Sequence, residues 1–267
     1  MIRCEDLHVT FNGGLPTEKL ALRGVDLTIS AGQFVTVIGS NGAGKSTLLN
    51  TIAGDIKSTQ GNIFFADKNV TKVPATGRTK DIARVFQDPL AGTCGNLTVE
   101  ENMALAYGRG SRGKLSFALN NKLRTIFKTQ LSRLNLGLED RLNSEMGLLS
   151  GGQRQSVSLL MSALQPSKIL LLDEHTAALD PKTAALIMDI SSQIIAEKQL
   201  TVMMVTHSMR QALDHGSRTI MLHEGKIIFD LAGEERAGYD VKDLLNLFAQ
   251  ARSDGEELDD DKLLLGH

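Results

Sequence analysis

The spacing of apolar and polar residues predicts strands and a helix at the beginning of the chain. Residues 2–11 have the partial alternation of a strand, and residues 35–38 form a short apolar run that ends in a glycine-rich turn. A helix is expected from Lys45 through apolar positions to Gly54, which stands where a C-terminal helix cap belongs. This order of strand, glycine-rich turn and helix is typical of an α/β protein.

The middle of the chain changes to a helical period. Residues 61–66 and 82–86 still read as strands, and residues 98–101 have the spacing of a capping box ahead of a helix. From about residue 100 to 165 the pattern is mainly helical, with a glycine-rich interruption at residues 108–113. We therefore expect a helical lobe inserted into the core at about residues 100–165.

The core pattern then resumes. Residues 169–172 and 202–205 are short apolar runs on either side of a helix predicted over 183–197, an alternation expected of a parallel sheet. Two elements complete the prediction: a hairpin at 219–231 turning at Glu224 and Gly225, and an amphipathic helix at 240–252 with Val241, Leu244, Leu245 and Phe248 inward.

Composition and charge narrow the class of protein. The 267 residues fit one large domain with lobes over 1–252 and an acidic tail at 253–267, to which we assign no function. A net charge of −2 provides no general attraction for nucleic acid or anionic membrane. No run approaches the about 20 apolar residues of a membrane helix, and the start does not resemble a signal peptide. With two distant cysteines, a cytoplasmic protein is expected.

A phosphate-binding loop is the strongest chemical signal. The pattern is complete between an apolar strand and a helix start, and it comprises Gly39, Ser40, Asn41, Gly42, Ala43, Gly44, Lys45 and Ser46, with Thr47 following. Glycines let backbone N–H groups converge on phosphate oxygens, at the positive end of the helix dipole. Lys45 then supplies charge to the β- and γ-phosphates, and Ser46 a hydroxyl to Mg²⁺. A glycine-rich turn with a solvated lysine is the weaker alternative.

Asp173 and Glu174 end the apolar run at 169–172, where parallel sheets place their ligand sites. Asp173 is expected to hold Mg²⁺ through water, and Glu174 to polarise an attacking water as general base. Taken alone, such a run is more often a strand entering a loop. The phosphate-binding loop makes it a candidate metal and water site.

The chain resembles the nucleotide-binding subunits of ABC transporters over most of its length. Gln87 falls at the position of that family's Q-loop and His207 at that of its switch histidine. Two further motifs are matched, the signature by Leu149, Ser150, Gly151, Gly152 and Gln153, and the D-loop by Ala178, Leu179 and Asp180. The resemblance implies an α/β fold: a P-loop NTPase core with a mainly parallel sheet, an N-terminal antiparallel β subdomain and an inserted α-helical subdomain.

The resemblance also implies how the site works. Glu174, His207 and Gln87 would be catalytic, and Ser46, Gln87 and Asp173 would hold Mg²⁺. ATP would be bound by one chain through Phe11, Ser40, Asn41, Gly42, Ala43, Gly44, Lys45, Ser46 and Thr47, and by its partner through Ser150, Gly151, Gly152 and Gln153. The two chains would form a head-to-tail dimer, with the D-loop at their interface. Stacking of Phe11 on adenine competes with a simple core role for that ring.

Three positions depart from the family pattern. Proline commonly stands where this chain has His175, and arginines are frequent at the positions of Ser156 and Ser162. None of them is an expected nucleotide ligand. The helical lobe is locally basic, and we interpret its basic residues as a solvated face in preference to a site for phospholipid or a partner. These residues are Arg109, Arg112, Lys114, Lys122, Arg124, Lys128 and Arg133.

A transport ATPase is the expected function. Partners would be a second copy of the chain, transmembrane permease subunits and a solute-binding protein, with no nucleic acid, at the cytoplasmic face of the inner membrane. A bacterial importer of an amino-acid-like solute is favoured, because residues 173–180 look similar to such a group. A split exporter and a soluble ABC ATPase remain alternatives, although the chain has neither the long coiled coils nor the tandem domains of the soluble classes.

Overall fold

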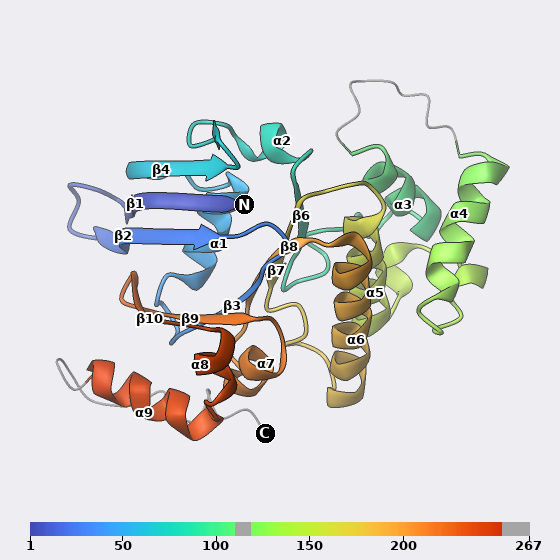
Figure 1. Ribbon diagram of the computed structural model, residues 1–267. Coiled ribbons are helices and arrows are strands. Elements are labelled where there is room, and N and C mark those ends of the chain that lie inside the picture. The colour runs from blue at the N-terminus through green and yellow to red at the C-terminus, as the bar shows by residue number, and fades with distance from the viewer. Residues whose placement is uncertain (110–118, 253–267) are drawn as a thin grey trace. The chain divides into compact units, whose positions relative to one another are not determined.

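The computed structural model describes residues 1–109 and 119–252 (Figure 1). It divides into two compact units, which we call the first unit, Met1–Arg78 with the chain from Thr201 onward, and the second unit, Thr79–Leu200. The acidic tail at 253–267, and Arg112 and Lys114 of the basic set, lie outside the described residues. Within the described residues no helix has the length and apolar character needed to cross a membrane.

An antiparallel sheet forms the N-terminal part of the first unit, in the order β2-β1-β4-β5. Its strands are β1 (Ile2–Phe11), β2 (Lys19–Ile29), β4 (Gln60–Phe65) and β5 (Lys68–Asn69). The register of β1 on β2 runs from the pair Ile2 and Ile29 to the pair Phe11 and Lys19, with bulges between. β1 and β4 were predicted from the sequence, whereas β2 was not. This sheet is the expected N-terminal antiparallel β subdomain.

A second, mixed set of strands in the first unit carries the candidate phosphate loop, in the order β10-β9-β3-β8. β3 pairs in parallel with β8 and with β9, and β10 pairs antiparallel with β9. The strands are β3 (Phe34–Ile38), β8 (Thr201–Val205), β9 (Arg218–His223) and β10 (Lys226–Ala232). Glu224 and Gly225 both have positive φ, 43° and 77°, as the tight turn of a hairpin requires.

Helices cover these strands. They are α1 (Lys45–Ala53), α2 (Ala75–Arg78), α7 (Met209–Asp214), α8 (Gly233–Ala237) and α9 (Val241–Arg252). α9 inserts the fully buried Leu244 and Phe248 into a cluster with Ile38, Met209 and Met221. Figure 1 shows α7, α8 and α9 gathered beside β9 and β10. α1 and α9 were both predicted, because their apolar spacing is strongly helical.

The second unit contains a parallel pair of strands and most of the long helices. The strands are β6 (Ile82–Val85) and β7 (Ile169–Asp173), paired from Ile82 with Ile169 to Val85 with Leu172. The helices are α3 (Val99–Tyr107), α4 (Asn121–Ser132), α5 (Gly151–Ala163) and α6 (Pro181–Lys198), with the short 3₁₀ helices η1 (Leu138–Asp140) and η2 (Met146–Leu148).

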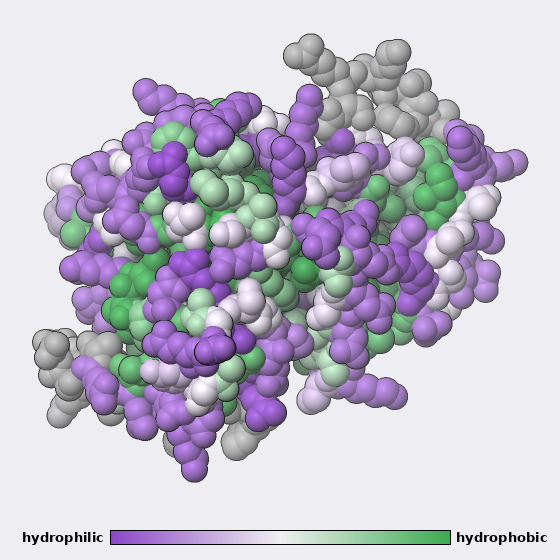
Figure 2. Space-filling view, viewed as in Figure 1, coloured by the Kyte–Doolittle hydropathy of each residue, from purple (hydrophilic) through white to green (hydrophobic). Residues whose placement is uncertain are grey.

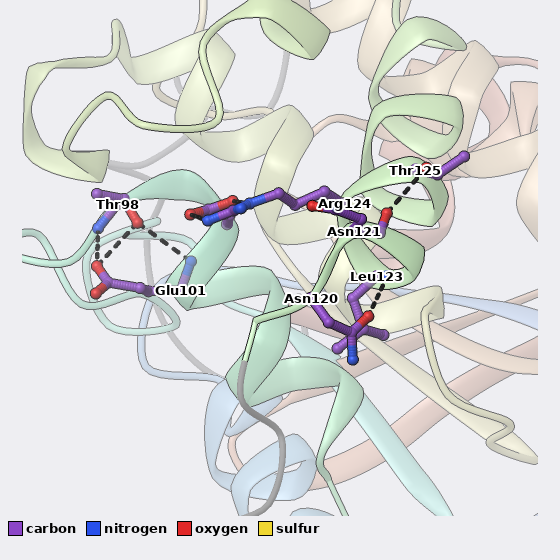
Figure 3. A network of polar contacts seen from close by, with 8 residues as sticks. Thr98, Glu101, Asn120, Asn121, Leu123, Arg124 and Thr125 are labelled. Carbon is purple, nitrogen blue, oxygen red and sulfur yellow. Dashed lines mark hydrogen bonds and ion pairs between the residues drawn. The ribbon is translucent and has the colours of Figure 1, made fainter.

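Local hydrogen bonds explain where α3 and α4 begin (Figure 3). Thr98 accepts from the Glu101 backbone N–H and donates from its own to that side chain, which completes the predicted capping box. These bonds to Thr98 hold the pKa of Glu101 below its usual value. Asn120 caps α4, and Arg124 on its first turn reaches back to Glu100 with a bidentate contact of 2.8 and 3.0 Å.

The architecture is therefore α/β, as predicted, with an antiparallel N-terminal sheet, parallel strand pairs and a helix-rich stretch between β6 and β7. The visible surface is mainly hydrophilic, and apolar side chains show in small patches between polar ones (Figure 2).

Candidate functional site

The candidate phosphate loop joins β3 to α1 in the first unit. Gly39, Gly42 and Gly44 have φ values of 145°, 78° and 103°, a backbone that side chains with a Cβ rarely adopt. Gly44 is also the N-cap of α1, so the N–H groups of the first turn of this helix lie at the loop. The glycine spacing in the sequence thus corresponds to a real conformational need at each position.

Lys45 lies inside this loop. Its side chain is buried, and its ammonium group donates to the carbonyl oxygens of Gly39 at 2.7 Å and Ser40 at 3.1 Å. A pocket of about 260 Å³ opens at the loop, and Phe11 from the end of β1 lies in its wall. Besides Phe11, its lining includes Asn41, Gly42, Ala43, Gly44, Lys45, Ser46 and Thr47. The structure therefore brings the aromatic candidate and the phosphate loop together in one concave site.

The turn of the β9–β10 hairpin supports the phosphate loop from outside. The Gly225 N–H donates to the Ala43 carbonyl oxygen at 3.0 Å, and the Gly225 carbonyl accepts from the Arg23 N–H at 2.9 Å. A Cβ at Gly225 would lie 2.8 Å from the Ala21 carbonyl oxygen, and one at Gly44 would lie 2.6 Å from the same atom. Sequence reasoning missed this role of Gly225, because only tertiary structure brings the hairpin turn to the loop.

Arg78 fixes the other end of α1. Its guanidinium is buried and donates to carbonyl oxygens at the end of that helix, those of Thr51 and Ile52, and also to Val70 and Val73. Burial lowers the pKa of Arg78 from its usual value. These bonds satisfy carbonyls that a helix end leaves without partners. Arg78 was also missed, since a single arginine at the end of the short helix α2 gives no sequence signal.

Asp173 and Glu174 lie in the second unit, at the end of β7. Asp173 is buried, and its carboxylate accepts from Arg84 on the neighbouring strand β6 at 2.9 Å; each of the two side chains is 12% exposed. The Arg84 guanidinium also lies 4.3 Å from the centre of the Phe86 ring. Glu174 follows with a φ of 43°, a left-handed backbone that is costly for a glutamate. Such strain at a candidate general base is typical of functional sites.

His175 comes next and points into the protein. Its side chain is buried, and Nε2 lies 3.2 Å from the hydroxyl oxygen of Ser191 on α6. Thus the residue that departs from the family pattern has a defined partner. The other departures, Ser156 and Ser162, are buried serines whose hydroxyls donate to carbonyl oxygens of their own helix, Gly152 at 2.9 Å and Leu159 at 2.6 Å.

The signature segment forms the beginning of α5. Ser150 is the N-cap, accepts from the Gln153 N–H at 3.2 Å and donates its own N–H to the Gln153 side chain, a complete capping box. Gly152 packs closely on the next helix, since a Cβ there would lie 2.4 Å from Thr183 Cγ2. At Gly151 a Cβ would meet nothing within 4 Å. Ser150 therefore begins a helix, and the two glycines that follow it differ in their packing.

The D-loop candidates lie ahead of α6, in the same unit. Ala178 is exposed, Leu179 is half-buried, and Asp180 is the N-cap of α6. Hydrogen bonds from the side chain and backbone of Thr183 lower the pKa of Asp180. Gln87 follows β6 and is exposed, while Gln155 on α5 donates to the carbonyl oxygen of the preceding Phe86 at 3.1 Å. That bond links the signature helix to the Q-loop.

The predicted residues thus form two sets, one in each unit. Phe11 and the phosphate loop share a pocket in the first unit, and His207 lies half-buried just after β8 in that unit. The second set contains Gln87, the signature segment, Asp173, Glu174 and the D-loop candidates. In the first unit, backbone N–H groups, an ammonium and a hydroxyl suit the phosphates of a nucleotide. In the second unit, the carboxylates of Asp173 and Glu174 are the kind of ligand that a hard cation prefers.

Comparison with known proteins identifies the family. Residues 22–177 match the ABC transporter family. The chain is 41% identical over 251 residues to a tyrosine transport ATP-binding protein of Clostridioides difficile, covering 94% of this chain and 100% of that protein. It is 34% identical to the phosphonates import ATP-binding protein PhnC of Lactococcus lactis subsp. cremoris, over 88% of this chain and 94% of that protein.

A solved structure agrees with these relatives. The dimeric post-hydrolysis state of the ATP-binding cassette MJ0796, bound to ADP and Pi, superposes with a TM-score of 0.76 at 30% identity, covering 90% of this chain and 100% of that one. The expected P-loop NTPase fold is thereby confirmed. With the phosphate loop, the signature helix and the acidic strand end in place, this chain belongs to the ABC transporter family and is one of its ATP-binding, ATP-hydrolysing subunits.

Proposed function

We propose that this ATPase powers import of a small amino-acid-like solute through separate permease subunits, at the cytoplasmic face of the inner membrane. The observation that carries the proposal is the similarity to the tyrosine transport ATP-binding protein, which extends over 94% of this chain and all of that protein. The phosphonate relative is named as an import protein, which supports the direction of transport. A solute-binding protein acting outside the permease completes the proposed assembly.

The first unit binds the nucleotide. Phe11 stacks on adenine at the wall of the pocket, and the loop from Ser40 to Thr47 surrounds the phosphates with N–H groups. Lys45 exchanges its carbonyl contacts with Gly39 and Ser40 for the β- and γ-phosphates, since a phosphate anion is the stronger partner for an ammonium group.

Hydrolysis needs residues of both sets. Mg²⁺, held by the Ser46 hydroxyl with Asp173 and Gln87, would neutralise charge on the β- and γ-phosphates. Glu174 accepts the proton of the attacking water, and its left-handed backbone fixes the direction of the carboxylate. His207 donates a hydrogen bond to the γ-phosphate.

A second copy of the chain completes each site. Ser150, Gly151, Gly152 and Gln153 of one copy present the start of α5 to the γ-phosphate held by the other, so that a second helix dipole stabilises the same anion. Ala178, Leu179 and Asp180 lie at the interface between the copies. The dimeric state of the solved cassette supports this arrangement.

The permease docks on the second unit. A pocket of about 420 Å³ opens beside the loop that follows Gln87, and Cys94 and Leu105 lie in its wall. Leu90 and Leu105 are 50% and 60% exposed, which provides apolar contact area for a partner. Asn102 holds the loop by accepting from the Cys94 N–H at 2.7 Å and donating to the Cys94 carbonyl at 3.0 Å. The loop therefore offers a defined docking surface close to Gln87.

Transport in vesicles tests the function. The chain is co-purified with its permease, reconstituted into liposomes that contain Mg-ATP, and supplied with the solute-binding protein and tyrosine or another amino acid outside. Uptake is expected, with ATP hydrolysis stimulated by the solute. Glu174→Gln should keep ATP binding but lose both activities, because an amide cannot accept the proton of water. ATP-dependent loss of solute from preloaded vesicles, without uptake, would show that the transporter is an exporter.

The shared site has its own test. In Glu174→Gln protein, Mg-ATP should convert monomer to dimer, since each nucleotide adds binding energy only to the closed form. Ser150→Arg should prevent that closure and leave ATP binding in the first unit intact. Sedimentation and nucleotide binding are measured on the same samples, with Lys45→Ala as the control that loses both. A Ser150→Arg single variant that hydrolyses ATP at the parent rate as a monomer would contradict the shared site.

A further inference from the structure

The buried contact between His175 and Ser191 connects the backbone after Glu174 to helix α6. Both side chains are almost completely buried, at 2% and 1% exposure, and His175 Nε2 lies 3.2 Å from Ser191 Oγ. Nothing in the nucleotide chemistry proposed above uses either side chain. A buried polar pair of this kind is costly to break, because each group would lose a partner away from water.

Neighbouring hydrogen bonds decide which atom donates. The Ser191 hydroxyl also lies 2.7 Å from the carbonyl oxygen of Ile187, one turn earlier in α6, and a carbonyl can only accept. Since a hydroxyl has a single proton, Ser191 donates to Ile187 and accepts from the imidazole. His175 therefore carries its proton on Nε2 and donates to Ser191.

The backbone next to this contact is strained. Glu174 has a φ of 43°, and its carbonyl oxygen accepts from the Ala177 N–H at 3.0 Å, so the chain turns sharply directly after the carboxylate. A left-handed conformation persists at a residue with a Cβ only where surrounding contacts over-determine it. The imidazole of His175 is the next side chain along, and it is tied to a rigid helix.

We propose that His175 is a positioning residue for ATP hydrolysis: through Ser191 it holds the strained backbone of Glu174 so that the carboxylate faces the attacking water. The proposal rests on the function of Glu174 as general base. The hydrogen bond donated to Ser191 ties the backbone that directly follows the carboxylate to helix α6.

Four variants separate positioning from simple packing. His175→Leu removes the donor but keeps much of the volume, and His175→Gln offers an amide N–H near the position of Nε2. Ser191→Ala removes the acceptor. Ser192→Ala is the matched control, because Ser192 is the next residue of α6 and donates to the Met188 carbonyl oxygen at 2.9 Å in the same way, without a contact to His175.

Steady-state hydrolysis by the assembled transporter and thermal unfolding are measured for each variant. We expect His175→Leu and Ser191→Ala each to lower kcat by about threefold to tenfold, the effect of one hydrogen bond, with KM for ATP changed less than about twofold. The double variant should lose no more than either single one, since both remove the same bond. His175→Gln should recover most of kcat, and Ser192→Ala should retain the parent value.

Two results would overturn the inference: equal kcat in Ser191→Ala and Ser192→Ala, or a fall in melting temperature for both His175→Leu and Ser191→Ala with kcat at the parent value. Ser191→Ala keeps the test decisive if His175→Leu does not fold. Glu174→Gln is measured in the same series to separate the role of Glu174 from that of His175. Turnover in Glu174→Gln would show that Glu174 is not the general base. An inactive Glu174→Gln together with a fully active Ser191→Ala would contradict only the positioning role of His175.

Discussion

Among single residues, Arg84 shows how a buried charge beside the candidate metal site is neutralised. Arg84→Met would remove the cation that lies 2.9 Å from the buried Asp173 carboxylate, so we expect the free energy of unfolding to fall by about 2 to 4 kcal/mol. The control is Arg133→Met in the same unit, whose partner Glu197 is 53% exposed, and which should cost less than about 1 kcal/mol. Urea unfolding measures both. Equal losses would mean that burial of the Arg84 pair has no energetic consequence.

Gly225 is the second residue with a specific expectation. In Gly225→Ala, the new Cβ would clash with the Ala21 carbonyl oxygen, at a φ of 77° that alanine rarely adopts. We expect the hairpin turn to move, and the phosphate loop to move with it, because Gly225 is hydrogen-bonded to Ala43. A displacement that costs about 1.4 kcal/mol would weaken ATP binding about tenfold. Gly32→Ala is the control, because Gly32 has a φ of 73° but open space around it. Fluorescent-nucleotide titration should show weaker binding for Gly225→Ala but not for Gly32→Ala. Equal affinities would mean that the hairpin turn does not support nucleotide binding by the loop.

The two cysteines differ in chemistry as well as in exposure. Burial raises the pKa of the Cys4 thiol to about 12, so it stays protonated and unreactive until the pH approaches that value. Cys94 is exposed. At pH 8 a maleimide should therefore modify Cys94 within minutes and leave Cys4 intact, whereas both react in guanidinium chloride. Mass spectrometry of the peptides checks this, and rapid native labelling of Cys4 would mean that the β1 sheet opens readily.

At the scale of elements, the packing of α5 on the start of α6 predicts opposite behaviour for the adjacent signature glycines. Gly152→Ala should destabilise the protein by about 1 to 3 kcal/mol through overpacking against Thr183, while Gly151→Ala should be neutral. Thr183→Ser removes the Cγ2 atom that clashes and should rescue Gly152→Ala. Thermal unfolding provides the measurement, separately from turnover. Without rescue by Thr183→Ser, the clash assigned to Thr183 would be wrong.

The elements that were predictable from the sequence are those with local signals. α1 has helical apolar spacing and Gly54 as its cap, α3 has a capping box, and the β9–β10 hairpin turns at Glu224 and Gly225. β2 was missed because Arg23 and Gly24 break its pattern after the adjacent apolar pair Ala21 and Leu22, and its strand character depends on pairing with β1.

In the candidate site, too, the residues with local sequence signals could be predicted and those that depend on tertiary structure could not. Its motif residues could be named from the sequence, because glycines and acidic residues at fixed spacing have a chemical meaning. The supports could not: Arg84, Gly225 and the His175–Ser191 contact depend on which strands and helices become neighbours. Those neighbours are set by long-range packing, which single-sequence periodicity does not encode.

For the whole molecule, docking on a permease can be checked through its own thiol. Cross-linking at Cys94 in the assembled transporter should capture a permease subunit, because the pocket beside the Q-loop faces that partner in our proposal. The control combines Cys94→Ser with Lys68→Cys, which moves the thiol to the exposed strand β5 of the other unit. Capture from Lys68→Cys but not from Cys94 would place the permease on a different face.

Support of the phosphate loop by the β9–β10 turn also affects the order in which the protein gains function during synthesis. The loop leaves the ribosome early, but its partner Gly225 is translated only after the whole second unit. An unfinished chain therefore has the glycine-rich motif without the turn that braces it. Full nucleotide affinity is therefore expected only after the hairpin has been translated, so a chain released before Gly225 should bind ATP more weakly than the complete chain.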